Sequence, residues 1–189
     1  MARAREFDTE AAVEAAMWAF RRTGFEGTSI QDLVEATGVG RGSLYAAFGS
    51  KEGLYLAAVD RYRDRYALPL IEELRRGLPV RDLVHGILLD LVDEIAADGN
   101  RHACLMVSAA VERAPHDPEV RVRIRATTAS LEDAFADLIG AQGLSGDRDP
   151  RDLARFLMTT IHGMRVMAAI NPDRAALTAI AEVALGCLA

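Results

Sequence analysis

Apolar residues recur along almost the whole chain at intervals of three and four positions, which is the spacing of one face of an α-helix. The regular alternation of apolar and polar residues that is typical of half-buried strands is missing from the sequence. The pattern therefore predicts an all-α protein. No internal repeat of roughly 20 to 50 residues accompanies it, so the sequence does not indicate a solenoid.

Cap and breaker residues divide this pattern into about nine helices. Gly24 ends the first of them, and Pro118 begins another directly after a breaker segment. A long fourth helix carries Pro69, where we expect a bend. The predicted ranges are 9–23, 29–37, 41–48, 51–76, 81–97, 102–113, 118–139, 152–170 and 172–188.

The second and third helices form the most distinctive part of the pattern. Thr28 begins a capping box, in which its hydroxyl can accept the N–H of Gln31 while the Gln31 side chain returns the bond. Residues 38–40, Gly-Val-Gly, then separate two short helices by a tight turn, which is typical of a helix-turn-helix. We therefore expect an N-terminal three-helix helix-turn-helix domain over residues 1–50, a motif that binds DNA, followed by a C-terminal helical bundle over residues 51–189.

The third helix has the two faces that a DNA-reading helix needs. A short helix enters the major groove when one face is anchored on the protein and the other carries small or polar groups. Leu44 and Phe48 supply the anchored face, and Gly42 would let the helix approach the duplex closely. The outer face holds Arg41, Gly42, Ser43, Tyr45 and Ala46.

The last two predicted helices are apolar on more than one face, and a single partner face cannot cover them. A four-helix bundle formed by two subunits would bury both, so we expect a homodimer; the alternative is a core within one chain. The predicted interface residues are Leu153, Phe156, Leu157, Ile161, Met164, Leu177, Ile180, Ala184, Leu185 and Leu188, with Met167 and Val183 on the same helices.

The middle helices carry enough apolar residues to enclose a pocket for a small apolar or amphipathic effector. Four polar residues could orient such a ligand, and each could equally have a structural role: His85, His102, Glu112 and His162. The pocket residues that we predict are Leu88, Leu91, Met106, Phe135 and His162.

Composition agrees with a folded protein, because 50% of the residues are hydrophobic and 26% are charged. The net charge of −6 disfavours a non-specific binder of polyanions. Residues 1–66 hold nine Lys or Arg and ten Asp or Glu, so the predicted DNA-binding part is neutral. A dimer that presents a few well-placed cations remains compatible with this balance.

Several classes of protein are disfavoured by what the sequence lacks. It has no apolar stretch of membrane-spanning length and no signal peptide, so we expect no membrane association and a cytoplasmic protein. Cys104 and Cys187 are typical of small buried hydrophobes, although a redox role for Cys104 stays open.

An enzyme that uses Cys104 or a histidine is the alternative from another class. His102 and Cys104 diverge by about 200° on a helix, and no nucleophile, phosphate-loop or metal motif occurs. We therefore expect no catalytic residue, no metal and no cofactor.

The segment from residue 24 to residue 55 closely resembles the tetracycline-repressor (TetR) family of regulators. The motifs that carry the resemblance are Thr28-Ser29-Ile30, Leu33-Val34, Thr37-Gly38-Val39, Gly42-Ser43-Leu44-Tyr45, Phe48 and Ser50-Lys51-Glu52. Residues 104–120 are also similar to a C-terminal pattern of one branch of that family.

The resemblance implies a ligand-responsive repressor that acts as a homodimer on a palindromic operator in double-stranded DNA. It places Arg41, Ser43 and Ala46 near base edges, with Arg41 as the reader of a guanine. It places Thr28, Tyr45 and Lys51 on phosphates.

The sequence departs from the family at two places. Gly40 stands where Ser or Thr commonly caps the third helix, and Ala46-Ala47 replaces a pair of larger residues. Base contacts from this helix would then be few, and affinity would rest more on phosphates and DNA shape. A ligand-responsive dimer that has lost DNA binding is the alternative that these departures leave open.

Overall fold

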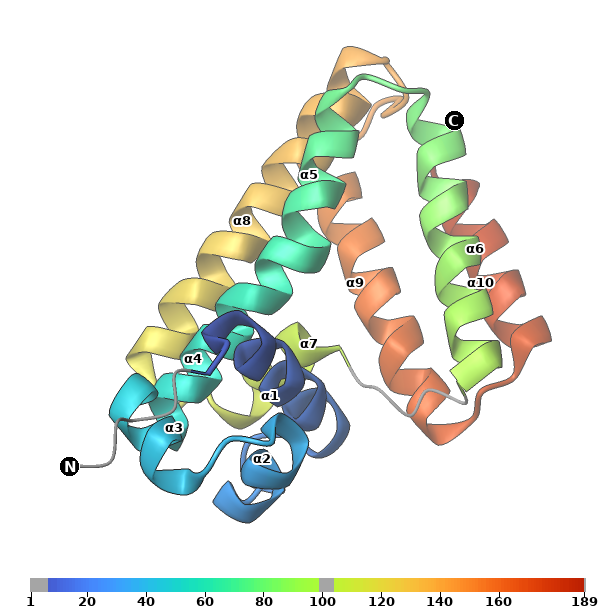
Figure 1. Ribbon diagram of the computed structural model, residues 1–189. Helices are drawn as coiled ribbons and strands as arrows, with labels where there is room; N and C mark the ends of the chain where they lie inside the picture. Colours follow the sequence, from blue (N-terminus) through green and yellow to red (C-terminus); the bar gives the residue numbers. More distant parts are fainter. Residues whose placement is uncertain (1–6, 99–103, 189) are drawn as a thin grey trace. The chain divides into compact units, whose positions relative to one another are not determined.

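The computed structural model describes residues 7–98 and 104–188, which form helices and turns with no strand (Figure 1). This confirms the all-α prediction. The helix over residues 51–75 is continuous, so the helices of this part of the chain make up nine separate stretches, as predicted. The elements are α1 Thr9–Thr23, α2 Ile30–Thr37, α3 Arg41–Phe48, α4 Lys51–Tyr62, the π-helical turn η1 Arg63–Ala67, α5 Leu68–Arg75, α6 Val80–Asp98, α7 Leu105–Glu112, α8 Pro118–Ala141, α9 Pro150–Ile170 and α10 Arg174–Leu185.

The chain forms two compact units, and each is made from two separate stretches of sequence. The N-terminal unit contains the described residues up to 65 together with residues 104–125, so that α7 and the start of α8 pack with α1 to α4. The C-terminal unit contains the remaining described residues. These units are not divided at residue 50, and the functional division predicted there stays a prediction.

An aromatic cluster forms the centre of the N-terminal unit. Phe20 of α1 and Tyr55 of α4 meet edge to face with ring centres 4.9 Å apart, and Phe25 lies 5.0 Å from Tyr55. All three side chains are at most 4% exposed. Burial of three rings stabilises the packing of α1 on α4 and fixes the turn that carries Phe25.

The start of α2 differs from the prediction. Ser29 is the N-cap, and it forms a capping box with Asp32: Ser29 Oγ accepts the N–H of Asp32, and the Asp32 carboxylate accepts the N–H of Ser29. The capping box that we predicted between Thr28 and Gln31 is therefore wrong by one residue. The reason is that Thr28 is buried and its hydroxyl donates to the carbonyl of Gly24.

The expected irregularity near Pro69 takes the form of a π-helical turn. Pro69 has no N–H, and its ring would clash with the carbonyl of Arg65 in a regular α-helix. The wider turn η1, over residues 63–67, contains this carbonyl and directly precedes α5. A π turn is one of the recognised ways in which a helix accommodates such an interruption.

The C-terminal unit has one apolar core, to which α5, α6, α9, α10 and the later part of α8 contribute. In Figure 1, α6 and α10 run side by side. Arg81 of α6 ties the end of the chain to this core, because its Nη1 donates to the carbonyl of Leu188 at 2.6 Å. In the described part of the chain, no helix combines the length and hydropathy that crossing a bilayer requires.

Candidate nucleic-acid interface

Helix α3 is anchored to the N-terminal unit along one face. Leu44 is 2% exposed and Phe48 is half-buried, in agreement with the predicted anchored face. Gly40 is the N-cap and offers no side-chain hydrogen bond, while Gly49 follows the helix with φ of 76°. The residues of the other face remain at the surface.

Two large side chains on the outer face of α3, Arg41 and Tyr45, contact each other. Arg41, Gly42 and Ala46 are exposed, and Ser43 and Tyr45 are half-buried. Arg41 Cζ lies 5.5 Å from the centre of the Tyr45 ring, and Arg41 Nη2 donates to the Tyr45 hydroxyl across 3.5 Å. The Tyr45 ring and hydroxyl thus give the Arg41 guanidinium a partner within the protein, and such a cation–π contact is modest at an exposed site.

Glycines at the start of α3 leave the backbone there uncovered by side chains. A Cβ atom built at Gly40 or at Gly42 would meet no heavy atom within 4 Å. Packing within the protein therefore does not require glycine at these two positions. Close approach of another molecule to the backbone is a physical reason for glycine at such a place.

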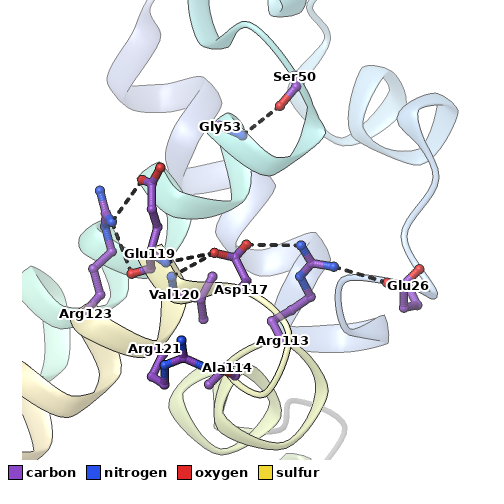
Figure 2. A network of polar contacts seen from close by, with 10 residues as sticks. All are labelled: Glu26, Ser50, Gly53, Arg113, Ala114, Asp117, Glu119, Val120, Arg121 and Arg123. Carbon is purple, nitrogen blue, oxygen red and sulfur yellow. Dashed lines mark hydrogen bonds and ion pairs between the residues drawn. The ribbon is translucent and has the colours of Figure 1, made fainter.

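Lys51 lies at the positive end of α4. Ser50 caps this helix by accepting the N–H of Gly53 at 3.1 Å (Figure 2). The Lys51 ammonium rests 4.2 Å from the centre of the Phe25 ring. A lysine and the N–H groups of a first helical turn both favour an anion, so a phosphate would suit this position.

Thr28 does not offer its side chain to the surface. The residue is 0% exposed, and its hydroxyl donates to the Gly24 carbonyl and shares a 2.7 Å hydrogen bond with the Thr23 hydroxyl. Its hydroxyl closes the turn between α1 and α2. We therefore leave the Thr28 side chain out of the DNA contacts that we propose below.

The sequence around α3 holds few cations. Arg41 and Lys51 are the only Lys or Arg between residues 30 and 60. The Ser29 hydroxyl and the backbone N–H of Ser29 hold the pKa of the Asp32 carboxyl below its usual value, so Asp32 stays ionised. This local balance of charge opposes non-specific binding to polyanions. Arg41 and Lys51 are the cations that this stretch of sequence offers to DNA.

The five predicted pocket residues are distributed over both units. Leu88, Leu91 and Phe135 belong to the packed core of the C-terminal unit and are at most 3% exposed. Met106 lies on α7 in the N-terminal unit. His162 is half-buried, and its Nδ1 has no hydrogen-bond partner among the residues that the structure describes. The pocket stays a prediction.

The polar residues that we considered beside this pocket have different surroundings. His85 Nε2 lies 3.8 Å from a carboxylate oxygen of Glu182, at the surface. The Glu112 carboxylate binds two backbone N–H groups of the N-terminal unit, at Phe25 and Glu26. His102 is outside the described residues.

Most of the predicted dimer residues are already covered within the subunit. Leu153, Leu157, Met164, Leu177, Ala184, Leu185 and Leu188 are at most 4% exposed. Phe156 and Ile180 are 42% and 39% exposed, and Ile161 is half-buried. The predicted set therefore mixes core residues with residues that are available to a partner.

The exposed apolar residues of α9 and α10 gather into a surface that we call the α9–α10 face. Its members are Phe156, Val166, Met167, Ile170, Ile180 and Val183. Phe156, Ile180 and Val183 also line a groove of about 380 Å³ with an almost wholly apolar wall. Sequence reasoning missed Val166 and Ile170, although both belong to the apolar pattern of α9.

No group of three or more His, Cys, Asp or Glu side chains within the described ranges could hold a metal ion. Cys104 is buried and accepts a hydrogen bond from the Tyr62 hydroxyl across 3.4 Å. Cys187 is half-buried.

Comparison with known proteins gives two family matches that together span most of the chain. Residues 12–58 match the family described as bacterial regulatory proteins, tetR family. Residues 81–183 match the family described as transcriptional regulator LmrA/YxaF-like, C-terminal domain. The second match covers more than half of the chain and includes the segment from Cys104 to Val120.

Individual relatives agree with these matches. The chain is 34% identical to the HTH-type transcriptional regulator YezE of Bacillus subtilis (strain 168), over 100% of both chains. It is 32% identical to the HTH-type transcriptional repressor ComR of Escherichia coli (strain K12), over 88% of this chain and 81% of that protein. These curated relatives are transcriptional regulators and not enzymes.

Among solved structures, a cysteine mutant of the TetR family transcriptional regulator CifR is similar over 99% of this chain and 100% of that chain. Its TM-score is 0.83 and its sequence identity is 32%. That structure is a complex with 26-bp double-strand operator DNA.

Proposed function

Because the chain belongs to the TetR family of DNA-binding transcriptional regulators, we propose that it is a ligand-responsive repressor that binds a palindromic operator as a homodimer. The observation that carries the proposal is the outer face of α3, where the exposed Arg41 guanidinium lies 5.5 Å from the centre of the Tyr45 ring and Gly42 leaves the helix backbone uncovered. Repression is supported by the ComR relative, and operator binding by the CifR complex.

The DNA contacts that we propose divide by what they read. Arg41, with Ser43 and Ala46, lies near base edges, where the planar guanidinium suits O6 and N7 of a guanine. Gly42 lets the duplex approach the helix backbone. Tyr45 and Lys51 bind phosphates, which fix the orientation of α3 in the groove.

Dimerisation and response to small effectors are typical of the TetR family. A palindrome follows from two symmetric copies of α3, which read successive turns of one groove about 34 Å apart. The α9–α10 face is the surface that we assign to the second copy, because its apolar residues are exposed in the single chain. The predicted interface residues Phe156 and Ile180 belong to this contact, whereas Ile161 packs against the core of the C-terminal unit.

The effector would bind the part of the chain after residue 50, where we predicted a pocket for a small apolar or amphipathic molecule. A ligand that lowers operator affinity 100-fold needs about 2.7 kcal/mol of differential binding between two states of the protein. The cytoplasm, where a regulator meets DNA and small metabolites together, is the compartment that we propose.

The test begins by selecting DNA from a library of random duplexes with the purified protein at about 0.15 M salt. We expect a roughly palindromic sequence to be enriched. Arg41→Ala should then lower affinity for it by about 10- to 100-fold and relax the preference at one base pair of each half-site. Arg75→Ala, which removes an exposed cation from α5 of the C-terminal unit, is the control.

Two outcomes would overturn the proposal. One is that no sequence is enriched from the library. The other is that Arg41→Ala and Tyr45→Ala both bind the selected duplex as the wild type does, which would favour a ligand-responsive dimer that no longer reads DNA through α3.

A further inference from the structure

The end of α7 is hydrogen-bonded to the turn that follows α1. Glu112 is the last residue of α7, and its two carboxylate oxygens accept the N–H groups of Phe25 and Glu26, at 2.8 and 2.6 Å. A carboxylate that binds two backbone N–H groups forms charge-assisted hydrogen bonds, which are about twice as strong as neutral ones. These bonds join residues that are 86 and 87 positions apart in the chain.

Arg113, the next residue, lies against the same turn. Its guanidinium carbon is 4.1 Å from the centre of the Phe25 ring. The guanidinium also pairs with Glu26 at 3.5 Å and with Asp117 at 3.1 Å, as Figure 2 shows. The planar group is thus held between the turn after α1 and the start of α8.

Phe25 connects this region to the proposed DNA contact. The Lys51 ammonium rests 4.2 Å from the centre of the ring that Arg113 also contacts, and the ring is 4% exposed. A displaced Phe25 would therefore remove the surface on which Lys51 lies. We call Phe25, Lys51, Glu112 and Arg113 the Phe25 cluster.

The Glu112 carboxylate lies directly against the turn at Gly24. A Cβ atom at Gly24 would lie 2.8 Å from Glu112 Oε2, closer than real Cβ contacts. The Tyr55 hydroxyl and Arg113 Nε are also buried within this part of the N-terminal unit. Tight packing of this kind transmits a displacement of one group to its neighbours.

We propose that Glu112 and Arg113 are positioning residues for DNA binding, which act through Phe25 on the Lys51 phosphate contact. The proposal rests on the proposed function and extends it. It gives a role to the segment 104–120, which resembles one branch of the family, lies far from α1 to α4 in the sequence and packs with them in the N-terminal unit. The affinity of α3 and α4 for DNA then depends on a carboxylate that never touches DNA.

The experiment measures affinity for the selected duplex as a function of salt. Glu112→Gln is compared with Glu119→Gln, which removes the same charge from the same unit at a side chain paired with Arg123 at 3.4 Å. Loss of a negative charge alone favours DNA binding in both variants. We expect Glu112→Gln instead to weaken binding about 10-fold, because Gln presents one acceptor oxygen to two N–H groups.

A double-mutant cycle with Lys51→Met tests the path. Lys51→Met should reduce the salt slope by about 1, as for one lost phosphate contact. In that background, Glu112→Gln should have little further effect. Glu112→Asp, which keeps the charge and one bond, should restore part of the affinity. Equal effects of Glu112→Gln with and without Lys51 would overturn the proposal, as would equal effects of Glu112→Gln and Glu119→Gln.

Further measurements distinguish a local change at the turn from unfolding of the variant, and failure of this proposal from failure of the proposed function. Hydrogen exchange should show faster exchange at the Phe25 and Glu26 amides in Glu112→Gln while the far-UV circular dichroism is unchanged. If Glu112→Gln does not fold, Arg113→Lys takes its place, because lysine keeps the charge but lacks the planar group. If the wild type selects no DNA, the proposed function fails by itself, before any variant is compared.

Discussion

At the scale of single residues, Gly24 shows how one position can be fixed by two independent constraints. Its backbone has φ of 73° and ψ of −178°, a conformation that is essentially restricted to glycine. Its missing side chain also leaves space for the Glu112 carboxylate. Gly38 shares the positive φ, at 67°, but a Cβ there would meet nothing within 4 Å.

These two glycines give a matched test of the Glu112 contact. Gly38→Ala should lower the free energy of unfolding by about 1 kcal/mol, which is the backbone cost of a left-handed alanine. Gly24→Ala should cost about 3 kcal/mol, because it adds displacement of Glu112 to a larger backbone cost. Urea denaturation of both variants measures the difference. Equal losses would show that the carboxylate moves aside freely.

Among elements, α8 has an unusually well-defined start. Asp117 Oδ1 accepts the N–H groups of Glu119 and Val120, at 3.0 and 3.2 Å, and Pro118 is the first helical residue. Burial raises the pKa of Asp117, but the N–H of Val120, the Arg113 guanidinium and the N–H of Glu119 together outweigh burial and lower it.

Because the pKa of Asp117 is lowered in the folded protein, the free energy of unfolding depends on pH in the acid range. Asp117 contributes stability above the usual value of 3.8, and this contribution is lost as the pH falls through its lower pKa in the folded state. We therefore expect Asp117→Asn to destabilise the protein by about 1 kcal/mol at pH 7. The difference from wild type should shrink below about pH 3.8.

Denaturation curves at pH 7 and in acid check this expectation. Asp137→Asn removes a charge from an exposed position of the same helix and serves as the control. A difference between wild type and Asp117→Asn that stays constant into acid would contradict the role of the ionised carboxylate.

Local signals explain which elements could be predicted from the sequence. The bounds of α1 and α3 match the prediction, because glycine ends each helix and the turn residues are unambiguous. The cap of α2 was misplaced because Thr28 and Ser29 are both good caps, and the choice between them depends on the burial of Thr28 in a turn. That turn is held by Glu112, a contact from a distant part of the sequence.

The candidate site shows the same limit. The outer face of α3 follows from helical spacing and could be predicted. The support of Lys51 by Phe25 could not, since neither residue carries a signal for the other. Glu112 was considered as a ligand-orienting group because of its place among the apolar middle helices, whereas its carboxylate is bound to two backbone N–H groups of the turn that follows α1.

For the molecule as a whole, the α9–α10 face decides the oligomeric state that we propose. Val183 is 71% exposed on that face, and Val122, on α8 in the N-terminal unit, is 66% exposed. Val183→Glu should give a monomer, because a carboxylate buried between two subunits has no partner there. Val122→Glu should remain a dimer.

Sedimentation measures the oligomeric state of the two variants, and a binding assay measures their affinity for the selected duplex. The monomer should bind the selected duplex at least 100-fold more weakly, because each half-site is then bound alone. A dimeric Val183→Glu variant would show that the subunits associate through another surface.

The N-terminal unit is built from two separate stretches of sequence, so it cannot be completed until the second stretch has been synthesised. Residues 66–103 are synthesised between the two stretches that build this unit. A chain that is still emerging from the ribosome can form α1 to α4 early, but the turn at Phe25 receives Glu112 only after another 86 residues or so have followed. The regulator therefore completes its DNA-reading part late in translation. For the same reason, a chimera that takes α1 to α4 from this protein must also take the segment from Cys104 to Arg125, or supply a carboxylate in its place.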